Sequence, residues 1–232
     1  MSSTNRGSDR KLLDQYHTPK WPLKRLLEVF QPADGPLLDP CAGRGQFTEA
    51  CVAAGVSSSR WYAQELDPSL KSFLEGQLDP NRVLIRDFLK EQPFPSSWPT
   101  RFGAVFTNPP YTHIQAFLTR GLQLSDQVIF LLSTGYLGTG GRAQSFREFP
   151  PDLYVLPERI SFTGDGGSDS TNYAFYVWDK KNCGRRFGQY TMLGSTPKDE
   201  RCLGRRPKKT PSVEVAPDQP PVGKRTKKKT SS

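Results

Sequence analysis

Apolar residues along this chain fall into short runs that are separated by segments with helical periodicity. The fully apolar run at 128–132 is typical of a strand in a parallel sheet, which is buried on both faces. Further strands are predicted at 37–39, 61–67, 83–86, 104–107, 154–156 and 173–178. The run at 173–178 is aromatic, which favours a strand at the edge of the sheet, paired antiparallel to its neighbour.

Helical patterns alternate with these strands. Residues 22–30 and 114–123 place their leucine, isoleucine and phenylalanine side chains on one face, and residues 48–54 continue a turn into a third helix. Alternating strands and helices predict a doubly wound α/β sheet. Ligands of such sheets bind at the carboxyl ends of the strands, so residues at those ends are the candidates for function.

A rigid polar turn follows the apolar run at 104–107. Its sequence is Asn108-Pro109-Pro110-Tyr111, and the two prolines fix φ and remove two backbone donors, so that nearby carbonyl groups stay available as acceptors. The Asn108 amide oxygen and the Pro109 carbonyl could together accept from an exocyclic amino group, while the Tyr111 ring stacks on the base. The turn predicts a site that holds an adenine or cytosine amine toward an electrophile; a plain proline-rich turn is the alternative.

A glycine-containing turn comes after the strand at 37–39. The strand ends in an acid, and the turn is Asp39-Pro40-Cys41-Ala42-Gly43-Arg44-Gly45. Glycine lets a backbone turn sharply and approach a ligand closely, and the following helix offers free N–H groups to a negative group. The third glycine of a dinucleotide fingerprint is absent, and no Gly-Lys-Ser/Thr comes next that would make a P-loop.

Two further strands also end in acids. Glu65 could accept both hydroxyls of a ribose, whereas Asp67, followed by Pro68, is typical of a helix N-cap. We assign Glu65 to the ribose and Asp67 to the cap. After the next strand, Asp87 could accept from an adenine amino group and Phe88 could cover the ring, although a surface acid and a core phenylalanine explain the same pair.

These motifs together resemble the S-adenosylmethionine-dependent amino-methyltransferases, in particular the DNA adenine-N6 group, over roughly residues 14–180. Residues 15–19 are similar to the family's N-terminal cofactor motif, and the cofactor motifs precede the catalytic one, as in the gamma arrangement. The resemblance implies a Rossmann-like class I methyltransferase fold, α/β, with a doubly wound, mostly parallel sheet of seven strands whose last strand is antiparallel. The cofactor-binding residues that it implies are Tyr16, Thr18, Pro19, Asp39, Pro40, Cys41, Ala42, Gly43, Gly45, Glu65, Asp87, Phe88 and Asn108.

The resemblance implies direct transfer of a methyl group to the N6 amine of a flipped adenine. Asn108 and Pro109 would hold the amine, and Pro110 and Tyr111 would complete the catalytic motif. Phe162 could form the second wall of the base pocket, opposite Tyr111; ordinary core packing is the alternative. No cysteine nucleophile is needed, because the loop that carries one in a cytosine-C5 enzyme is Pro-Pro-Tyr in this chain.

The chain departs from the family in having little room for a target-recognition region. About fifty residues lie beyond Lys180, and most of them are tail, whereas reading a groove would need a folded module. The sequence therefore predicts a DNA adenine methyltransferase of relaxed specificity, of the kind found in mobile or phage elements. The alternatives are an RNA adenine methyltransferase acting on an unpaired base, a protein glutamine-N5 methyltransferase, which also uses Asn-Pro-Pro-Tyr, and a degenerate fold kept as a nucleic-acid-binding module.

Composition adds bounds on the class of protein. With 232 residues and a mean hydropathy of −0.61, we expect one folded domain, at 11–197, with polar tails. The chain has no long apolar stretch and no signal-like start, so we expect a soluble, cytoplasmic protein with no membrane partner. The four cysteines form no C-x-x-C pair and there are two histidines, so no metal site is expected, and isolated thiols fit a reducing compartment.

Residues 198–232 carry most of the charge. They hold eleven Lys or Arg and four Asp or Glu, a net charge of +7 out of +9, with five prolines and few large apolar residues. Such a segment cannot bury enough surface to fold, and its basic end at 224–229 favours nucleic acid as a partner, DNA before RNA. A tail that only keeps the protein soluble is the alternative. Residues 1–10 are also polar and are expected to be mobile.

Overall fold

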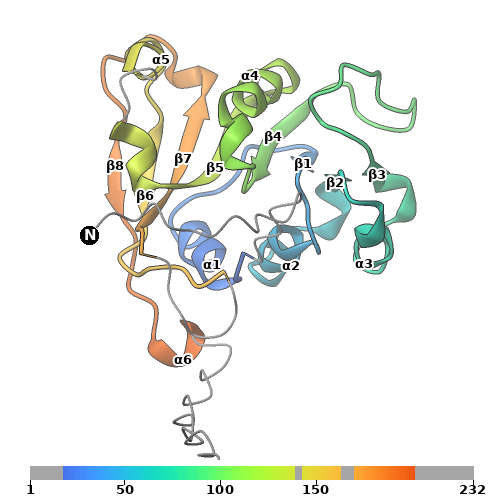
Figure 1. Cartoon of the computed structure of the whole chain (residues 1–232), viewed down its shortest axis with the longest axis horizontal. Coiled ribbons are helices and arrows are strands. Elements are labelled where there is room, and N and C mark those ends of the chain that lie inside the picture. Colours follow the sequence, from blue (N-terminus) through green and yellow to red (C-terminus); the bar gives the residue numbers. More distant parts are fainter. Residues whose placement is uncertain (1–17, 139–142, 163–169, 202–232) are drawn as a thin grey trace, which may run out of the picture.

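The computed structural model describes residues 18–138, 143–162 and 170–201 (Figure 1). One sheet runs through the molecule, with its strands in the order β3-β2-β1-β4-β5-β7-β6-β8. The strands are β1 (Leu37–Asp39), β2 (Trp61–Glu65), β3 (Val83–Ile85), β4 (Phe102–Thr107), β5 (Ser125–Ser133), β6 (Asp152–Val155), β7 (Tyr173–Asp179) and β8 (Tyr190–Met192). The helices are α1 (Trp21–Leu27), α2 (Gln46–Ala53), α3 (Lys71–Glu75), α4 (Ile114–Leu124), α5 (Ala143–Glu148) and α6 (Lys198–Arg201).

The predicted doubly wound α/β sheet is confirmed. All neighbouring strands run parallel, except that β7 is antiparallel to both β5 and β6. The sheet has eight strands where seven were expected, because β8 adds to its edge. This three-residue strand carries the exposed side chains of Tyr190 and Met192, and a short exposed run has no apolar pattern by which it could be found.

The position predicted for the aromatic run of β7 is wrong. The strand is antiparallel, as expected, but it lies between β5 and β6 rather than at the edge. Six of its residues, Tyr173 to Trp178, are buried, because both faces of the sheet are covered at this point. The aromatic side chains therefore serve the core, and β8 takes the edge position.

The core has two parts, one on each face of the sheet. Successive residues of β5 alternate between them: Ile129 packs in the cluster that contains the buried residues of α1 and α2, and Val128 and Phe130 pack in the cluster that contains those of α4. Residues 128–132 are thus buried on both faces, as a strand inside a parallel sheet must be.

Two helical boundaries differ from the sequence pattern. The helix expected at 22–30 ends at Leu27, and Phe30 beyond it packs edge-on against Tyr154 at 5.3 Å. The short helix α5 was not predicted, because it buries no residue completely; its Phe146 ring stacks on Trp178 at 6.3 Å. Propensity and periodicity are weak over so few residues.

The chain keeps regular structure beyond the domain boundary expected at residue 197. Glu200, in α6, accepts from Lys24 and Arg25 of α1 at 3.0 and 3.3 Å. Two cations on α1 give this carboxylate partners that the composition of 198–232 did not reveal. The basic residues after Arg201, and residues 1–10, lie outside the described part of the chain.

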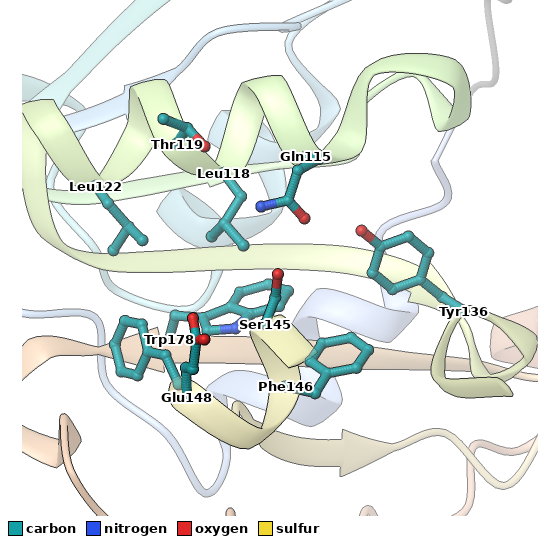
Figure 2. Close-up of a pocket in the computed structure, with 10 residues that line it drawn as sticks. Gln115, Leu118, Thr119, Leu122, Tyr136, Ser145, Phe146, Glu148 and Trp178 are labelled. Carbon is teal, nitrogen blue, oxygen red and sulfur yellow. The ribbon is translucent and has the colours of Figure 1, made fainter. Parts of the chain in front are cut away.

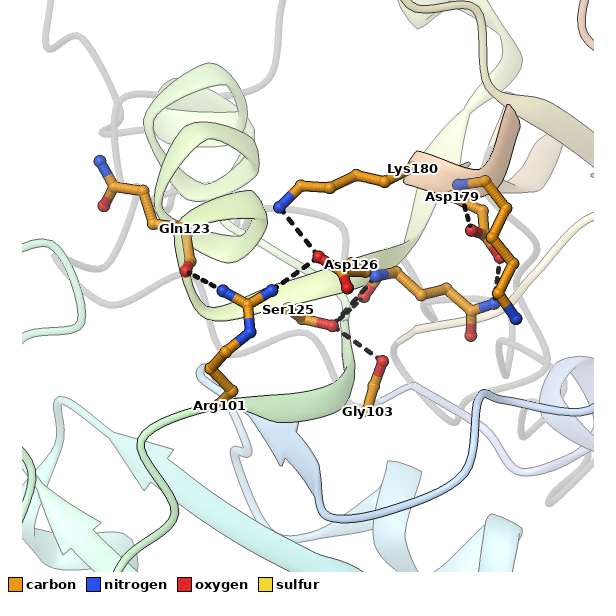
Figure 3. Close-up of polar contacts among 9 residues, drawn as sticks. Arg101, Gly103, Gln123, Ser125, Asp126, Asp179 and Lys180 are labelled. Carbon is orange, nitrogen blue, oxygen red and sulfur yellow. Dashed lines mark hydrogen bonds and ion pairs between the residues drawn. The ribbon is translucent and has the colours of Figure 1, made fainter. Parts of the chain in front are cut away.

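The amino end of the central strands is closed by polar contacts (Figure 3). The Ser125 hydroxyl donates to the carbonyl of Gly103 at 2.8 Å, which joins β5 to β4. Asp126 accepts from Arg101 at 2.6 Å and from Lys180 at 3.0 Å, so one carboxylate ties together the starts of β4 and β5 and the end of β7. The carboxyl ends of the parallel strands lie at the other end of the sheet from these contacts, which is where open α/β sheets bind their ligands.

Candidate functional site

The strand order reverses between β1 and β4, and the predicted motifs lie at that point. From β1 the chain proceeds outward to β2 and β3, then returns to place β4 on the other side of β1. Both strands end at the same edge of the sheet, because they are parallel. Such a switch point leaves a crevice at the carboxyl ends, which is where open α/β sheets bind ligands.

The turn after β1 has the conformation that its glycines predicted. Gly43 and Gly45 have φ of 56° and 83°, in the left-handed region that favours glycine. The turn is fixed by two backbone bonds, from Ala42 N to the Gln64 carbonyl at 3.1 Å and from Gly45 N to the Ala42 carbonyl at 2.8 Å. The helix α2 begins directly after it, so its first N–H groups lie next to the glycine turn.

Asp39 is the most unusual group in this turn. Its carboxyl group is fully buried, and one oxygen accepts from the Thr107 hydroxyl at 2.7 Å and from Cys41 N at 3.1 Å. The other oxygen, Oδ2, has no hydrogen-bond partner among the described residues. Burial raises the pKa of Asp39 from 3.8 to about 7, and the nearby Glu65 carboxylate adds to the effect. A buried acid with an empty acceptor favours a cationic or proton-donating ligand.

Glu65 ties the glycine turn to the end of β2. One of its oxygens accepts from Gly43 N at 2.8 Å, and the other accepts from Leu66 N and Asp67 N at 2.7 and 2.9 Å. Asp67 accepts from Ser69 N at 2.9 Å and caps a short helix, as predicted. A carboxylate has about four acceptor positions, so Glu65 keeps room for a further donor. Its role toward a ribose stays a prediction.

The two residues predicted to contact the cofactor's adenine, Asp87 and Phe88, differ in how deeply they are buried. Asp87 is half-buried, and one of its oxygens accepts from Leu89 N at 3.0 Å, which closes a local turn. Phe88 is buried, and its ring lies 5.0 Å from that of Phe117 on α4. The described contacts of Phe88 are therefore those of a core residue, whereas Asp87 keeps an oxygen available.

Asn108 stands directly after β4 with its amide oriented. Its Nδ2 donates to the Thr18 hydroxyl at 3.2 Å, and Thr18 is itself buried. Its Oδ1 is buried and has no hydrogen-bond partner in the part of the chain that the structure describes. A buried amide oxygen without a donor is uncommon in a folded protein and costs free energy unless a ligand supplies the donor. Tyr16, also predicted near this site, lies outside the described residues.

The two candidate base-stacking residues lie at the same end of the sheet. The Tyr111 hydroxyl accepts from Ser133 N at 3.2 Å, and its ring is partly exposed. Phe162 is buried, with its ring 5.1 Å from that of Tyr173. Ser133 and Tyr173 are paired in the sheet, so the two aromatic side chains are anchored to one strand pair. Whether Phe162 faces a base stays a prediction, since its described ring contact is with Tyr173.

The remaining predicted residues line the turn or support it. Pro109 and Ala42 are buried, and Pro40 is buried at the start of the glycine turn, while Pro19 and Pro110 are half-buried. Burial, together with the nearby Asp39, raises the pKa of the Cys41 thiol well above its usual range. A thiol held neutral in this way is a poor nucleophile.

The residues that join the two turns were not predicted from the sequence. Thr107, the last residue of β4, links that strand to Asp39, and Ser133 anchors Tyr111. A threonine between a buried strand and the Asn108 turn was a readable signal, since a buried hydroxyl needs a partner. Ser133 gave no signal, because its contact uses the backbone N–H that every residue except proline has.

Other features of the described chain lie away from the ends of β1 and β4. No group of three or more His, Cys, Asp or Glu is placed to hold a metal ion in the described ranges. A cavity of about 150 Å³ lies on the flank of the sheet between α4 and α5, lined by Leu118, Phe146 and Trp178 among others (Figure 2). It is separate from the crevice at the ends of β1 and β4. No helix in the described part of the chain is long and apolar enough to cross a membrane.

Comparisons with known proteins agree with this architecture. No family model and no curated protein matches the chain. The methyltransferase subunit of a type I restriction-modification system from Streptococcus thermophilus is similar, with a TM-score of 0.55 and 19% identity over 75% of this chain and 47% of that one. A provisionally assigned RNA methyltransferase from Pyrococcus horikoshii gives 0.54 and 18% over 72% and 88%.

A third similar structure is a provisionally assigned class I S-adenosylmethionine-dependent methyltransferase from Listeria monocytogenes. Its TM-score is 0.52 at 14% identity, over 78% of this chain and 67% of that one. The chain spans about half the length of the restriction-modification subunit. At these identities the likeness is one of fold, and the chain has the fold of the class I S-adenosylmethionine-dependent methyltransferases.

Proposed function

We propose that the protein is an S-adenosylmethionine-dependent methyltransferase that modifies the N6 amine of adenine in DNA. The observation that carries the proposal is the amide of Asn108, whose Oδ1 is buried without a donor among the described residues while its Nδ2 is held by Thr18. An exocyclic amine supplies the missing donor. This amide lies at the switch point, beside the glycine turn, which is where a bound cofactor and a target amine would meet.

The residues of the glycine turn fit S-adenosylmethionine. Gly43 and Gly45 adopt left-handed backbone conformations that shape the turn, and Oδ2 of Asp39 suits a positively charged ligand group. Glu65, at the end of β2, is the candidate for the ribose, and Asp87 for the adenine amine of the cofactor. When bound, this cofactor supplies an electrophilic methyl group.

The chain itself contributes orientation. Asn108 Oδ1 and the Pro109 carbonyl would accept hydrogen bonds from the two N–H groups of the N6 amine, which would turn the nitrogen lone pair toward the methyl donor. Once the new N–C bond has formed, the nitrogen would release one of its two protons to solvent. Tyr111, held by Ser133 N, offers its partly exposed ring for stacking, and Pro110 fixes the backbone between them. Positioning of this kind accounts for large rate effects without a protein nucleophile, in agreement with the neutral thiol of Cys41.

DNA is favoured over the alternative substrates by two observations. A similar fold belongs to a restriction-modification subunit, and the basic residues after Arg201 suit a polyanion better than a protein factor. An RNA adenine methyltransferase is the second candidate, favoured by the similar fold of the Pyrococcus protein. A protein glutamine methyltransferase would use the same four-residue turn, and a degenerate binding module would not bind the cofactor.

Mass spectrometry of nucleosides, and of the peptide where one is the substrate, tests the proposal. The full chain is incubated with cofactor carrying a labelled methyl group, together with adenine-containing DNA, RNA of the same sequence, or a glutamine peptide. We expect labelled N6-methyladenine in DNA. Label in RNA alone, or in glutamine alone, would show that RNA or a protein is the substrate instead of DNA. If calorimetry showed no binding of the cofactor, the protein would instead be a nucleic-acid-binding module without methyltransferase activity.

Replacing Glu65 by alanine should weaken cofactor binding. We expect a loss of about 1.5 to 3 kcal/mol, the range for hydrogen bonds to a charged group, because both the ribose contact and the tie to Gly43 N are removed. Calorimetric titration with S-adenosylmethionine measures the effect. The matched control is Asp67→Ala, which removes the helix cap and leaves Glu65 in place. Loss of affinity in the control together with unchanged affinity in Glu65→Ala would mean that the two acids were assigned the wrong way round.

A further inference from the structure

Strongly exposed apolar side chains gather at the outer edge of the sheet, away from the candidate site. Phe187 is 71% exposed, Tyr190 63% and Met192 53%. Three large apolar residues within six positions, all more than half exposed, make this segment a candidate interaction site. We call these three residues the β8 surface.

The backbone places two of these side chains on one face. Tyr190 is in register with Leu153 and Met192 with Val155, so both lie on the face of the sheet that faces α4 and α5. β8 has a strand neighbour on one side only, β6, and it is the outermost strand of the described sheet (Figure 1). Tyr190 and Met192 therefore lie on the strand at which the described sheet ends.

Positive charge is concentrated in the chain segment that contains the β8 surface. Residues 180–197 contain four Lys or Arg and no Asp or Glu. Lys180 is bound to Asp126 at 3.0 Å and Arg185 to Asp152 at 2.7 Å, whereas within the described ranges no carboxylate is paired with Lys181 or Arg186. The Arg186 guanidinium lies 5.2 Å from the centre of the Phe187 ring, so cation and aromatic ring form one platform.

We propose that the β8 surface binds single-stranded DNA next to the target adenine, and that single-stranded DNA is the preferred substrate; this inference rests on the proposed function. Exposed aromatic rings stack on bases, and adjacent cations neutralise phosphates, which is how proteins hold single strands without reading their sequence. A duplex keeps its base faces stacked inside, so it offers nothing to Phe187 and Tyr190.

Charge distinguishes this occupant from a second copy of the chain. A symmetric dimer through β8 would place the same patch against itself, and Lys181 and Arg186 of each copy would then face like charges. The strand is also three residues long, too short to add much backbone pairing. DNA, a polyanion, is attracted by the same positive charges that would repel a second copy of the chain.

The distance between the β8 surface and the candidate site at the end of β4 determines how long a DNA strand must be to contact both. Four strand spacings separate β8 from β4, which is about 19 Å at about 4.8 Å each. At the roughly 3.4 Å rise of a stacked strand this corresponds to about six nucleotides. A long oligonucleotide, with more than about six nucleotides on each side of the adenine, reaches the β8 surface, whereas a short one with about two on each side does not.

The experiment compares the wild-type chain with Phe187→Ala/Tyr190→Ala, using long and short single strands and the long duplex, by fluorescence anisotropy. We expect the double variant to bind the long single strand at least about tenfold more weakly, since stacking on an aromatic residue contributes about 1.4 kcal/mol or more per base. Binding of the short strand and of the duplex should not change. Val29→Ala, another exposed apolar residue, is the matched control and should behave as wild type.

Several results would overturn the inference. These are an unchanged ratio of long-strand to short-strand affinity, an equal loss on duplex DNA, tighter binding of single-stranded RNA than of DNA, or a change in molar mass that reveals a dimer through β8. Because anisotropy needs no turnover, the two proposals fail separately. Binding at the β8 surface without any N6-methyladenine would refute the proposed function, and methylation with unchanged binding in the double variant would refute the β8 surface.

Discussion

Replacing Asn108 by alanine should lower the rate of methyl transfer by at least about 100-fold and leave the affinity for S-adenosylmethionine nearly unchanged. The amide oxygen is a buried acceptor at the end of β4 that lacks a donor among the described residues, and it is oriented by the bond from Nδ2 to Thr18. Removing it leaves the target amine unheld while the glycine turn is untouched. Single-turnover rates and calorimetry on the same preparation measure the two effects.

Two further variants separate the acceptor from the rest of the side chain. Asn108→Asp keeps an oxygen that accepts but loses the donor to Thr18, so we expect activity between that of alanine and wild type. Asn182→Ala loses one hydrogen bond, to Asp152, at the far end of β7, and should keep full activity. Turnover by Asn108→Ala comparable to wild type would remove Asn108 from the proposed mechanism.

Replacing Asp39 by asparagine should flatten the dependence of folding stability on pH between about pH 4 and about pH 7. The pKa of the buried carboxyl group is raised from 3.8 to about 7, so in this window the native state holds a proton that the unfolded chain has released. Stability therefore falls as pH rises, and above pH 7 the whole cost is present, up to about 4 kcal/mol at about 1.36 kcal/mol per pKa unit. Asparagine removes this titration and keeps an oxygen for Thr107 and Cys41 N.

Denaturant unfolding at several pH values measures the stability. Asp126→Asn is the control, because Lys180 and Arg101 lower the pKa of that exposed carboxylate, so it titrates below the window. Parallel pH profiles for wild type and Asp39→Asn would show that Asp39 is ionised in the native state throughout.

Asp39 should also couple the binding of the cofactor to the release of a proton. A cationic ligand beside Oδ2 favours the ionised carboxylate, so binding of S-adenosylmethionine near pH 6.5 should release a proton from the wild-type protein. Calorimetric titration in two buffers with different ionisation enthalpies measures the number of protons released. Asp39→Asn should release none, and equal release by both proteins would place the proton elsewhere.

The sequence was sufficient for the class of architecture, an α/β doubly wound sheet, and for the position of the turns. Two-sided apolar runs such as 128–132 require a buried parallel strand, and left-handed glycines such as Gly43 require a sharp turn, so local chemistry determines both. The order of the motifs then places Asp39 and Asn108 at neighbouring strand ends. The cap at Asp67 was predicted for the same reason, because it depends on its immediate neighbours.

The features that could not be predicted depend on contacts between distant residues. The bond from Nδ2 of Asn108 to Thr18 joins positions 90 residues apart, and that from Thr107 to Asp39 joins positions 68 apart. The interior position of β7 results from the return of the chain through β6, which no periodicity encodes. Phe88 carried equal signals for a ligand and for the core, and only its contact with Phe117 shows the packing.

The separation of β8 from β4 has a consequence for how such a protein can change. Asn108 and the glycine turn sit on adjacent strands in the middle of the sheet, while β8 stands four strands away and has a neighbour on one side only. Insertions at β8 can lengthen the sheet without displacing either turn. Selection, or an engineer, could therefore graft a recognition segment onto this edge and retarget the protein while its chemistry is inherited unchanged.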